Sequence, residues 1–249
     1  MKIDLRDITF LMLIRLDSVE RLENILVVTN QLCKYFDTNI MLLEADTHQN
    51  HVLKRMLNKN INYSFVEDKD PVLYKTRYFN KMATTVTTPY LSIWDADIVV
   101  DKHAIMDSVG HLRGGADVAY PYNGYCYDVP LIIRRLYLER NDVRILHRHK
   151  KKMEMLHKRT LVGGAVFVCT DKYKYCGMEN EKHYGWGNDD FDRYYRFMNM
   201  GMNIYRTNIL LFHLYHPRLE NSTYRSFVHS RETISELVKI ENNSGKELF

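Results

Sequence analysis

The chain has 249 residues, a length suited to one large α/β domain, and its hydrophobic (45%) and charged (27%) fractions are those of ordinary globular proteins. Its 35 basic and 31 acidic residues leave a formal charge of +4, which excludes the strongly basic footprint of a general nucleic-acid binder; we expect no nucleic-acid partner. Four cysteines without CxxC or zinc spacing, and an N-terminus unlike a cleavable signal, favour free thiols and a cytoplasmic location.

The first hundred residues alternate between predicted strands and helices. Residues 8–14 form a continuous apolar run, typical of a strand buried on both faces of a parallel sheet and too short to cross a membrane. A helix with Asp17 as its expected N-cap follows. Further strands are predicted at 39–44, 61–66 and 90–94, with helices at 51–57 and 75–85. This alternation predicts a parallel sheet with helices on both faces, which binds ligands beyond the carboxyl ends of its strands.

The second half of the chain is less regular. Its predicted elements are strands at 117–120, 161–169, 203–207 and 209–212, with helices at 189–200 and 232–241. No repeat, low-complexity tract or flexible linker interrupts it. We therefore expect a single domain, with a nucleotide-binding half at 1–100, an acceptor and catalytic half at 101–230, and a peripheral C-terminal helix within 231–249.

Two carboxylates, Asp95 and Asp97, end the apolar strand at 90–94. Along an extended chain they would point to the same side, where a hard divalent cation and a diphosphate need such oxygen ligands. The competing interpretation is that the pair only caps a turn, because so short a motif specifies function poorly.

A second motif is Gly185-Trp186-Gly187-Asn188-Asp189-Asp190. Glycines on both sides of Trp186 allow a tight turn that presents an aromatic plate to a ligand such as a sugar ring. Carboxylates in the first turn of the following helix stay ionised because the helix dipole favours the charge, which keeps a proton acceptor available. The alternative is that these acidic residues serve helix stability alone.

A third motif is Phe212-His213-Leu214-Tyr215-His216. Imidazoles beside a carboxylate pair suit manganese better than a purely oxygen-ligated magnesium site. Spacing alone does not say whether His213, His216 or both bind metal, and either ring could be a hydrogen-bonded structural histidine.

Together and in this order, the motifs resemble those of the β-1,4-galactosyltransferase family and the related catalytic domains of polypeptide N-acetylgalactosaminyltransferases and chondroitin polymerases. The resemblance spans about residues 8–218 and rests on Phe79-Asn80-Lys81, Trp94-Asp95-Ala96-Asp97, Gly163-Gly164-Ala165-Val166-Phe167, the Trp186 motif and the His213 to His216 stretch. It implies a glycosyltransferase-A fold, which is Rossmann-like with a mixed, mainly parallel sheet and helices on both faces. It also implies a UDP-sugar donor, Mn²⁺ or another divalent cation as cofactor, and inversion at the anomeric carbon.

Carried over position by position, the resemblance implies a role for each motif residue. Asp190 is the expected general base, Asp189 binds the acceptor sugar, and Trp186 borders donor and acceptor. The metal is expected on Asp97, His216 and His213. The nucleotide-sugar is expected to contact Arg15, Phe79, Lys81, Asp95, Leu161, Gly163 and Gly164.

Two departures from the family pattern bear on the donor. Lys81 stands where the family has an arginine, so a point charge replaces a bidentate contact. Leu161 stands where galactose-specific members carry a tyrosine, and its smaller side chain leaves room for an N-acetyl group. We therefore lean toward an N-acetylhexosamine donor, although leucine is also the usual core residue.

Residues 134–159 are strongly basic. Such a segment is usually a solvated face, but it could also contact an anionic membrane surface, which would place the protein at the inner face of a membrane, or a pyrophosphate-linked acceptor.

The sequence thus predicts an inverting glycosyltransferase that moves a hexose or N-acetylhexosamine from a UDP-sugar to a hydroxyl of a glycan or lipid-linked oligosaccharide in polysaccharide assembly. Two alternatives remain open: a non-catalytic protein that binds glycans or nucleotide-sugars, and a metal-dependent phosphohydrolase. The first does not need a base at Asp190, and the second leaves the Trp186 motif unexplained.

Overall fold

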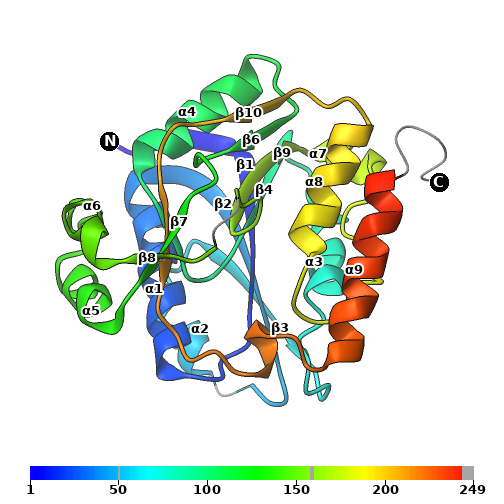
Figure 1. Cartoon of the computed structure of the whole chain (residues 1–249). Coiled ribbons are helices and arrows are strands. Elements are labelled where there is room, and N and C mark those ends of the chain that lie inside the picture. The colour runs from blue at the N-terminus through cyan, green and yellow to red at the C-terminus, as the bar shows by residue number, and fades with distance from the viewer. Residues whose placement is uncertain (50, 158–159, 243–249) are drawn as a thin grey trace.

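The computed structural model describes residues 1–49, 51–157 and 160–242, and its first half alternates strands and helices as predicted (Figure 1). These elements are β1 (Ile3–Ile14), α1 (Val19–Tyr35), β2 (Phe36–Asp46), α2 (Val52–Met56), β3 (Ile61–Glu67), α3 (Lys75–Ala83) and β4 (Tyr90–Trp94). The continuous apolar run in β1 is buried along its length because helices cover the sheet on both sides.

The second half completes that sheet and builds a smaller one. Its elements are β5 (Ile98–Val100), α4 (Lys102–Arg113), β6 (Val118–Tyr120), β7 (Cys126–Val129), α5 (Leu131–Arg140), α6 (Arg144–His149), η1 (Lys150–Lys152), β8 (Glu154–Met155), β9 (Ala165–Cys169), α7 (Thr170–Tyr175), α8 (Asp189–Asn199), β10 (Ile204–Arg206), β11 (Leu211–Leu214), η2 (Glu220–Ser222) and α9 (Phe227–Asn242).

Within the described ranges, seven strands form the central sheet in the order β10-β6-β9-β4-β1-β2-β3. Strand β9 runs antiparallel to both of its neighbours, whereas the other pairs are parallel. Figure 1 shows α1 and α4 on one side of the sheet and α3 and α8 on the other. The mixed, mainly parallel sheet with helices on both faces was predicted, and the structure confirms it.

Aromatic side chains close the centre of the core. The rings of Phe10, Trp94 and Phe167 come from β1, β4 and β9 and meet edge to face at centroid distances of 5.4 to 5.8 Å. The Trp94 indole also donates to the Ile98 carbonyl at 3.2 Å. This contact fixes the turn that follows β4, where Asp95 and Asp97 lie.

The second sheet, in the order β5-β11-β7-β8, was not predicted. Its strands have only two to four residues each, too few for alternation to stand out. Strand β11 pairs antiparallel with β5 and parallel with β7. This small sheet places the His213 segment directly beside the residues that follow Asp97.

Several predicted boundaries need correction. Ser18, not Asp17, caps α1, because the Ser18 side chain accepts from the Arg21 amide at 3.3 Å while Asp17 pairs with the Arg21 guanidinium at 2.9 Å. The strand expected from Leu161 begins at Ala165, since Gly163 and Gly164 lie in the preceding loop.

The basic segment contains helices that the sequence analysis left unassigned. Helices α5 and α6 and the turn η1 lie within residues 131–152, and the side chain of Arg134 on α5 is buried. Lys158 and Arg159 at its end lie outside the described residues.

The predicted C-terminal helix starts earlier than expected, at Phe227, and α9 packs beside α8 (Figure 1). The tail residues 243–249 lie outside the described residues. All four cysteines are free, as expected. In the described part of the chain, no helix combines the length and apolar character that crossing a bilayer requires.

Candidate active site

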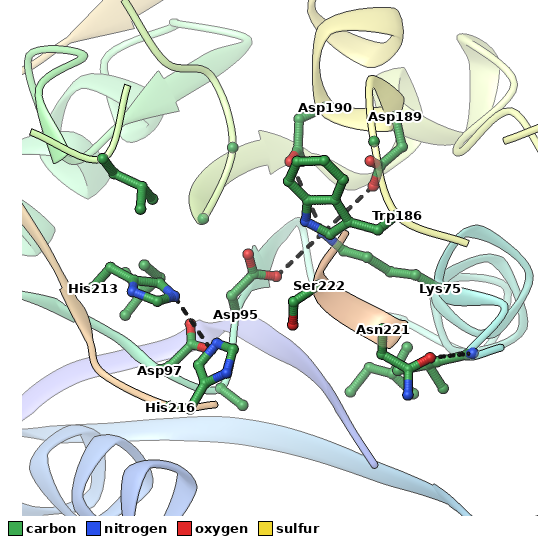
Figure 2. A pocket seen from close by; sticks show the side chains of 18 of the residues that line it. Lys75, Asp95, Asp97, Trp186, Asp189, Asp190, His213, His216, Asn221 and Ser222 are labelled. Carbon is green, nitrogen blue, oxygen red and sulfur yellow. Dashed lines mark hydrogen bonds and ion pairs between the residues drawn. The ribbon is translucent and has the colours of Figure 1, made fainter. Parts of the chain in front are cut away.

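A cavity of about 220 Å³ opens beyond the carboxyl ends of β1 and β4, where open α/β sheets bind ligands. The predicted site residues that line it are Arg15, Phe79, Asp95, Asp97, Leu161, Gly163, Gly164, Trp186, Asp189, Asp190, His213 and His216. In the view of Figure 2, Asp189 and Asp190 lie at one end, the Asp97 group lies at the other, and Asp95 lies between them.

The small sheet builds the Asp97 end. His213 of β11 lies opposite Ile98 of β5 in the antiparallel register, and the Leu214 amide donates to the Asp97 carbonyl at 2.8 Å. The Asp97 carboxylate then lies 3.2 Å from His216 Nε2 and 3.7 Å from His213 Nε2. Backbone pairing therefore brings the Asp97 carboxylate next to two imidazoles that lie more than a hundred residues further along the chain.

Each imidazole is oriented through its other nitrogen. His213 Nδ1 lies 2.8 Å from an Asp128 carboxylate oxygen, and His216 Nδ1 lies 2.8 Å from the Pro217 carbonyl oxygen. Partners of this kind fix the ring and turn Nε2 toward a metal in proteins. Asp128 lies on β7 in register with His213, and the sequence analysis did not identify it.

These residues fit a divalent metal ion. One ligand atom from each of Asp97, His213 and His216 lies within 4.8 Å of the others, and Asp97 and His216 are buried. Burial alone would raise the pKa of Asp97, but His213, His216 and Arg21 outweigh it and hold that pKa below its ordinary value. An ionised carboxylate beside two imidazoles is a donor set that suits manganese or zinc.

Asp95 has different partners from Asp97. The chain turns at residues 95–97 instead of staying extended, so the predicted alternation does not apply there. The Asp95 amide donates to the Gly164 carbonyl at 2.8 Å, and its carboxylate lies 3.4 Å from the Lys75 ammonium. Burial raises the pKa of Asp95 to about 6, an effect that Lys75 partly offsets. Asp95 thus faces the other end of the cavity.

Helix α8 builds that other end. Asn188 precedes the helix in the left-handed conformation, and Asp189 and Asp190 occupy its first turn. Gly187 has a φ of +119°, and a Cβ there would lie 2.5 Å from the Tyr224 ring, so only glycine fits. The expected tight turn around Trp186 is confirmed.

Lys75, at the start of α3, joins these carboxylates (Figure 2). Its ammonium lies 3.4 Å from Asp189 and 3.9 Å from Asp190, in addition to its contact with Asp95. Burial by itself would raise the pKa of Asp190, but Lys75 and Arg193 outweigh it and lower that pKa. Asp190 is therefore ionised at neutral pH and able to accept a proton.

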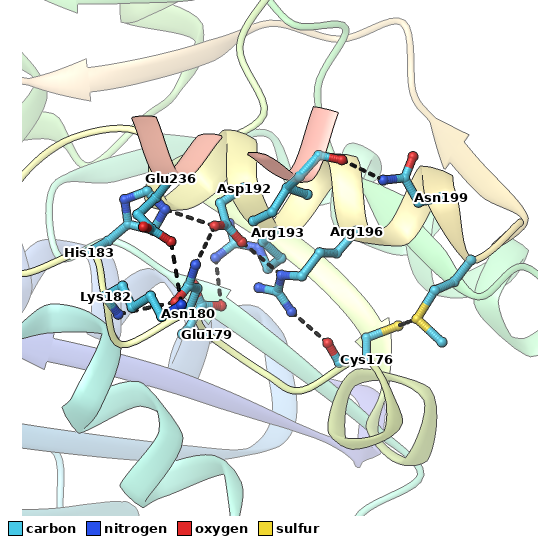
Figure 3. A network of polar contacts seen from close by, with 12 residues as sticks. Cys176, Glu179, Asn180, Lys182, His183, Asp192, Arg193, Arg196, Asn199 and Glu236 are labelled. Atoms are coloured by element: carbon cyan, nitrogen blue, oxygen red, sulfur yellow. Dashed lines mark hydrogen bonds and ion pairs between the residues drawn. The ribbon is translucent and has the colours of Figure 1, made fainter. Parts of the chain in front are cut away.

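Arg193, which Figure 3 shows in a network of polar contacts with Glu179, also holds the Asp190 carboxylate. Its guanidinium is buried and donates to Asp190 Oδ1 at 2.6 Å and to Glu179 Oε1 at 2.8 Å. Glu179 also accepts from the Tyr173 hydroxyl at 2.8 Å. Since Oδ1 is engaged, Oδ2 is the Asp190 oxygen left to face the cavity.

Gly163 makes room for that oxygen. A Cβ at position 163 would lie 2.2 Å from Asp190 Oδ2, and the Gly163 carbonyl accepts from the Tyr122 hydroxyl at 2.6 Å, which fixes the loop. The predicted Gly163-Gly164 motif therefore belongs to the site, with Gly163 serving the Asp190 side.

The segment that precedes α9 reaches back over the cavity. The Asn221 side chain accepts from the Leu73 amide at 2.8 Å, and the Ser222 hydroxyl accepts from Arg21 at 2.7 Å. The Tyr224 ring meets Trp186 edge to face at 5.1 Å. These residues, which the sequence analysis missed, bring the second half of the chain against the predicted nucleotide side.

Two predicted nucleotide contacts differ from expectation. The Arg15 guanidinium borders the cavity but donates to Ala45, Asp68, Asp70 and Pro71 oxygens, so it supports the loop that carries them. Lys81 does not line the cavity, because Phe79 and Asn80 take the buried face of α3 and Lys81 turns to solvent. The lysine that enters the cavity is Lys75.

Among the residues that were missed, only Arg193 carries a local signal. It lies three residues after Asp190 on a predicted helix, a spacing that pairs opposite charges. Lys75, Asp128 and Asn221 contact residues that are far away in sequence, and a local sequence pattern cannot predict such contacts.

Comparisons with known proteins bear on the resemblance and the fold. A sequence model of the N-terminal domain of galactosyltransferase matches residues 144–219, which contain the Trp186 motif as well as His213 and His216. No curated protein matches the sequence significantly.

Two solved structures share the fold. The catalytic domain of Drosophila β1,4-galactosyltransferase 7, solved with xylobiose, has a TM-score of 0.52 and 15% identity over 91% of this chain and 79% of its own. GalNAc-T7, solved with UDP, GalNAc and Mn²⁺, has a TM-score of 0.60 and 12% identity over 94% of this chain. The match covers 47% of GalNAc-T7, so the chain spans about half of its length.

The predicted resemblance to galactosyltransferases is thereby confirmed: the chain has the glycosyltransferase-A fold, and residues 144–219 are similar to the N-terminal domain of galactosyltransferase, which supports activity as a glycosyltransferase.

Proposed function

We propose that this protein transfers a hexose or N-acetylhexosamine from a UDP-sugar to a hydroxyl of an acceptor glycan or lipid-linked oligosaccharide, with inversion at the anomeric carbon and with a divalent metal ion as cofactor. The observation that carries the proposal is that the Asp97, His213 and His216 cluster and the Arg193-held Asp190 line one cavity. One end suits a diphosphate, and the other suits a hydroxyl that must lose its proton.

In the proposed reaction, the acceptor oxygen attacks the anomeric carbon while the bond from that carbon to the diphosphate breaks. Asp190 takes the hydroxyl proton through Oδ2, because Arg193 engages Oδ1. Asp97, His213 and His216 would hold a divalent cation such as Mn²⁺, which would supply positive charge to neutralise the departing diphosphate. A single displacement of this kind needs only one carboxylate at the reacting centre.

Other residues orient the two substrates. Asp189 is nearly buried and already bound to Lys75, so it offers a fixed acceptor for a sugar hydroxyl. Trp186 offers an aromatic face beside it, braced by Tyr224. Arg21, held by Ser222 and 3.9 Å from Asp97, lies where a donor diphosphate needs positive charge.

The lining supports an N-acetylhexosamine donor. Leu161 borders the cavity together with Cys126 and Leu156, and this group is apolar and without a bulky aromatic ring. An acetamido methyl group gains from such a surface, whereas a plain hydroxyl does not. Replacing Leu161 with Tyr should therefore shift the ratio of kcat/KM values from UDP-N-acetylhexosamine toward the unsubstituted UDP-hexose.

Calorimetric titration of UDP and UDP-sugars, with and without Mn²⁺, tests the proposal. We expect binding that depends on the metal, that is lost in Asp97→Ala, and that is unchanged in the matched control Asp171→Ala, whose carboxylate is exposed on α7. The absence of nucleotide binding under both conditions would contradict the proposal.

Two further assays separate the alternatives. A transferase releases UDP faster when an acceptor glycan is added, and the product carries the new sugar with inverted configuration. A phosphohydrolase instead releases phosphate from simple esters without an acceptor, and a binding module does neither while still binding the donor.

A further inference from the structure

The excursion that joins β7 to β8 consists of α5, α6 and η1 and projects from one side of the molecule (Figure 1). It is anchored on α1 by one buried face. Arg134 donates to the Asn24 side chain at 2.8 Å and to Glu23 at 2.8 Å, and the Tyr137 hydroxyl donates to Gln31 at 3.1 Å. Because this face is fixed to α1, the opposite face of α5 has a fixed orientation toward solvent.

That opposite face is rich in aliphatic side chains. Leu131, Ile132 and Leu136 are 51%, 77% and 40% exposed; Ile132 and Leu136 lie one turn apart on α5, and Leu131 directly precedes Ile132. Single exposed apolar residues are ordinary on a protein surface, but three within two turns of one helix form a patch. Met155, just beyond η1, is also exposed.

Basic side chains gather on the same excursion. Residues 131–155 hold eight of the 35 basic residues of the chain but only three of the 31 acidic ones, a net charge of +5 in a chain whose total is +4. Of the eight, only Arg134 is buried. The positive charge of the protein is therefore concentrated here and not spread over its surface.

We propose that the basic apolar face, meaning the exposed side chains Leu131, Ile132, Arg135, Leu136, Arg140, Arg148, Lys151 and Lys152 of this excursion, docks on the surface of an anionic lipid bilayer. Anionic headgroups attract the arginines and lysines, and the aliphatic side chains enter the boundary between headgroups and acyl chains. A second copy of the chain would bring like charges together, and a soluble polyanion offers the leucine and isoleucine side chains no apolar surroundings.

The position of the face in the chain connects docking with the cavity. Cys126, at the start of β7, and Leu156, just after β8, both line the active-site cavity. The strands that flank the docking excursion therefore both contact that cavity. Delivery of a lipid-linked acceptor from the docked bilayer rests on the proposed function; docking itself does not.

Cosedimentation of the whole protein with vesicles tests the proposal independently of transfer activity. We expect binding to vesicles of phosphatidylcholine with about one third phosphatidylglycerol, at least tenfold weaker binding to pure phosphatidylcholine, and weakening with salt. Equal binding to both vesicle types, or binding to neither, would overturn the proposal.

Variants separate the two contributions. Ile132→Glu with Leu136→Glu, and separately Lys151→Glu with Lys152→Glu, should each reduce binding to anionic vesicles at least tenfold. The matched controls are Val228→Glu, an equally exposed apolar residue on α9, and Lys54→Glu with Lys59→Glu, two exposed lysines elsewhere; these should bind like the unaltered protein. Thermal unfolding of each variant verifies that it is folded.

Competition with soluble dextran sulfate distinguishes a bilayer-docking face from a site for soluble polyanions. If the polyanion displaces the protein from vesicles and the Ile132→Glu, Leu136→Glu variant still binds vesicles normally, the face is a polyanion site and the bilayer proposal is wrong. Loss of vesicle binding in both pairs of variants, with the controls unaffected, supports the bilayer.

Discussion

The two ends of the active-site cavity are built by different means. At the Asp97 end, strand pairing sets the positions, since β11 lies between β5 and β7 and the Leu214 amide is bound to the Asp97 carbonyl. At the Asp190 end, a network of buried side chains centred on Arg193 holds a carboxylate in the first turn of α8.

This difference separates binding from chemistry. If the proposed function is right, loss of residues at the Asp97 end should remove affinity for metal and for the donor that the metal would help to hold. Residues at the Asp190 end are set for orientation and proton transfer, so their loss should reduce rate while donor affinity survives. Lys75 is the described side chain that contacts Asp95 in the middle and Asp189 and Asp190 at the far end.

The largest effect is expected for Asp190→Asn. The amide keeps the shape of the side chain but cannot take the acceptor proton, so kcat should fall by about 10²- to 10⁴-fold while the affinity for UDP-sugar stays the same. Initial rates of UDP release, together with calorimetry of donor binding, measure both. Turnover near that of the unaltered enzyme would show that Asp190 is not the base.

Arg193→Met tests the network behind Asp190. Methionine has a similar length, but it leaves the Glu179 and Asp190 carboxylates without their shared cation, and breaking a buried pair costs about 3–5 kcal/mol. Chemical denaturation should show this loss, and kcat should fall more than donor affinity. Arg55→Met, on the exposed face of α2, is the control and should be stable. Unchanged stability would mean that the network is not what fixes α8.

Asp128→Asn tests the other end. Asp128 contacts His213 from the far side of the ring, and loss of such a partner weakens metal binding by about 10- to 100-fold. Manganese affinity measured by calorimetry should fall in that range, whereas the free energy of unfolding without metal should change little because Asp128 is partly exposed. An unchanged metal affinity would remove Asp128 from the site.

The same division explains how much of the site could be predicted. The chain turns sharply directly after β4 and directly before α8, and both places carry local sequence signals: an apolar run that ends in Asp95, and glycines around Trp186. The resemblance to a known family then supplied roles for Asp97, Asp190 and the histidines.

Contacts between distant segments could not be predicted. Lys75 and Asp189 are 114 residues apart, and Asp128 and His213 are 85 apart, so only the folded chain brings them together. For Lys81, a local motif led to a wrong expectation. Its neighbours Phe79 and Asn80 match a family motif and are buried, but each residue along a helix is rotated by about 100° from the one before, so the Lys81 side chain points to solvent.

The large sheet was predicted well because its strands are long and apolar, as in β1. The missing elements have clear physical reasons. The small sheet has strands too short to show a period. Helix α5 was not predicted, because its buried face includes Arg134 and the segment was interpreted only as basic. Arginine is seldom buried unless it is paired, and Arg134 is paired with Glu23.

Acidification should affect His213 in the metal site and Asp192 on α8 in separate pH ranges, and this is the smallest expected effect. Burial alone would lower the pKa of His213, but Asp97 and Asp128 outweigh it and raise that pKa above its ordinary value of 6.5. Since metal binding requires a neutral imidazole, manganese affinity should weaken as the pH falls through the raised pKa of His213, by up to about tenfold per pH unit. Calorimetry at pH 7.5, 6.5 and 5.5 measures this.

Asp192, which lies on α8 two residues after Asp190 and contacts His183 and Arg196, should titrate only in more acidic solution. Burial would raise the pKa of Asp192, but His183 and Arg196 outweigh it and lower that pKa, so its contribution to stability is present above the unfolded value of about 3.9 and is lost as the pH falls toward the folded value. The difference in unfolding free energy between the unaltered protein and Asp192→Asn should therefore stay constant from pH 7 to 5 and shrink below about 4. A difference that shrinks between pH 7 and 6, together with metal affinity, would mean that the Asp192 contacts on α8 and the metal site titrate together and would contradict this separation.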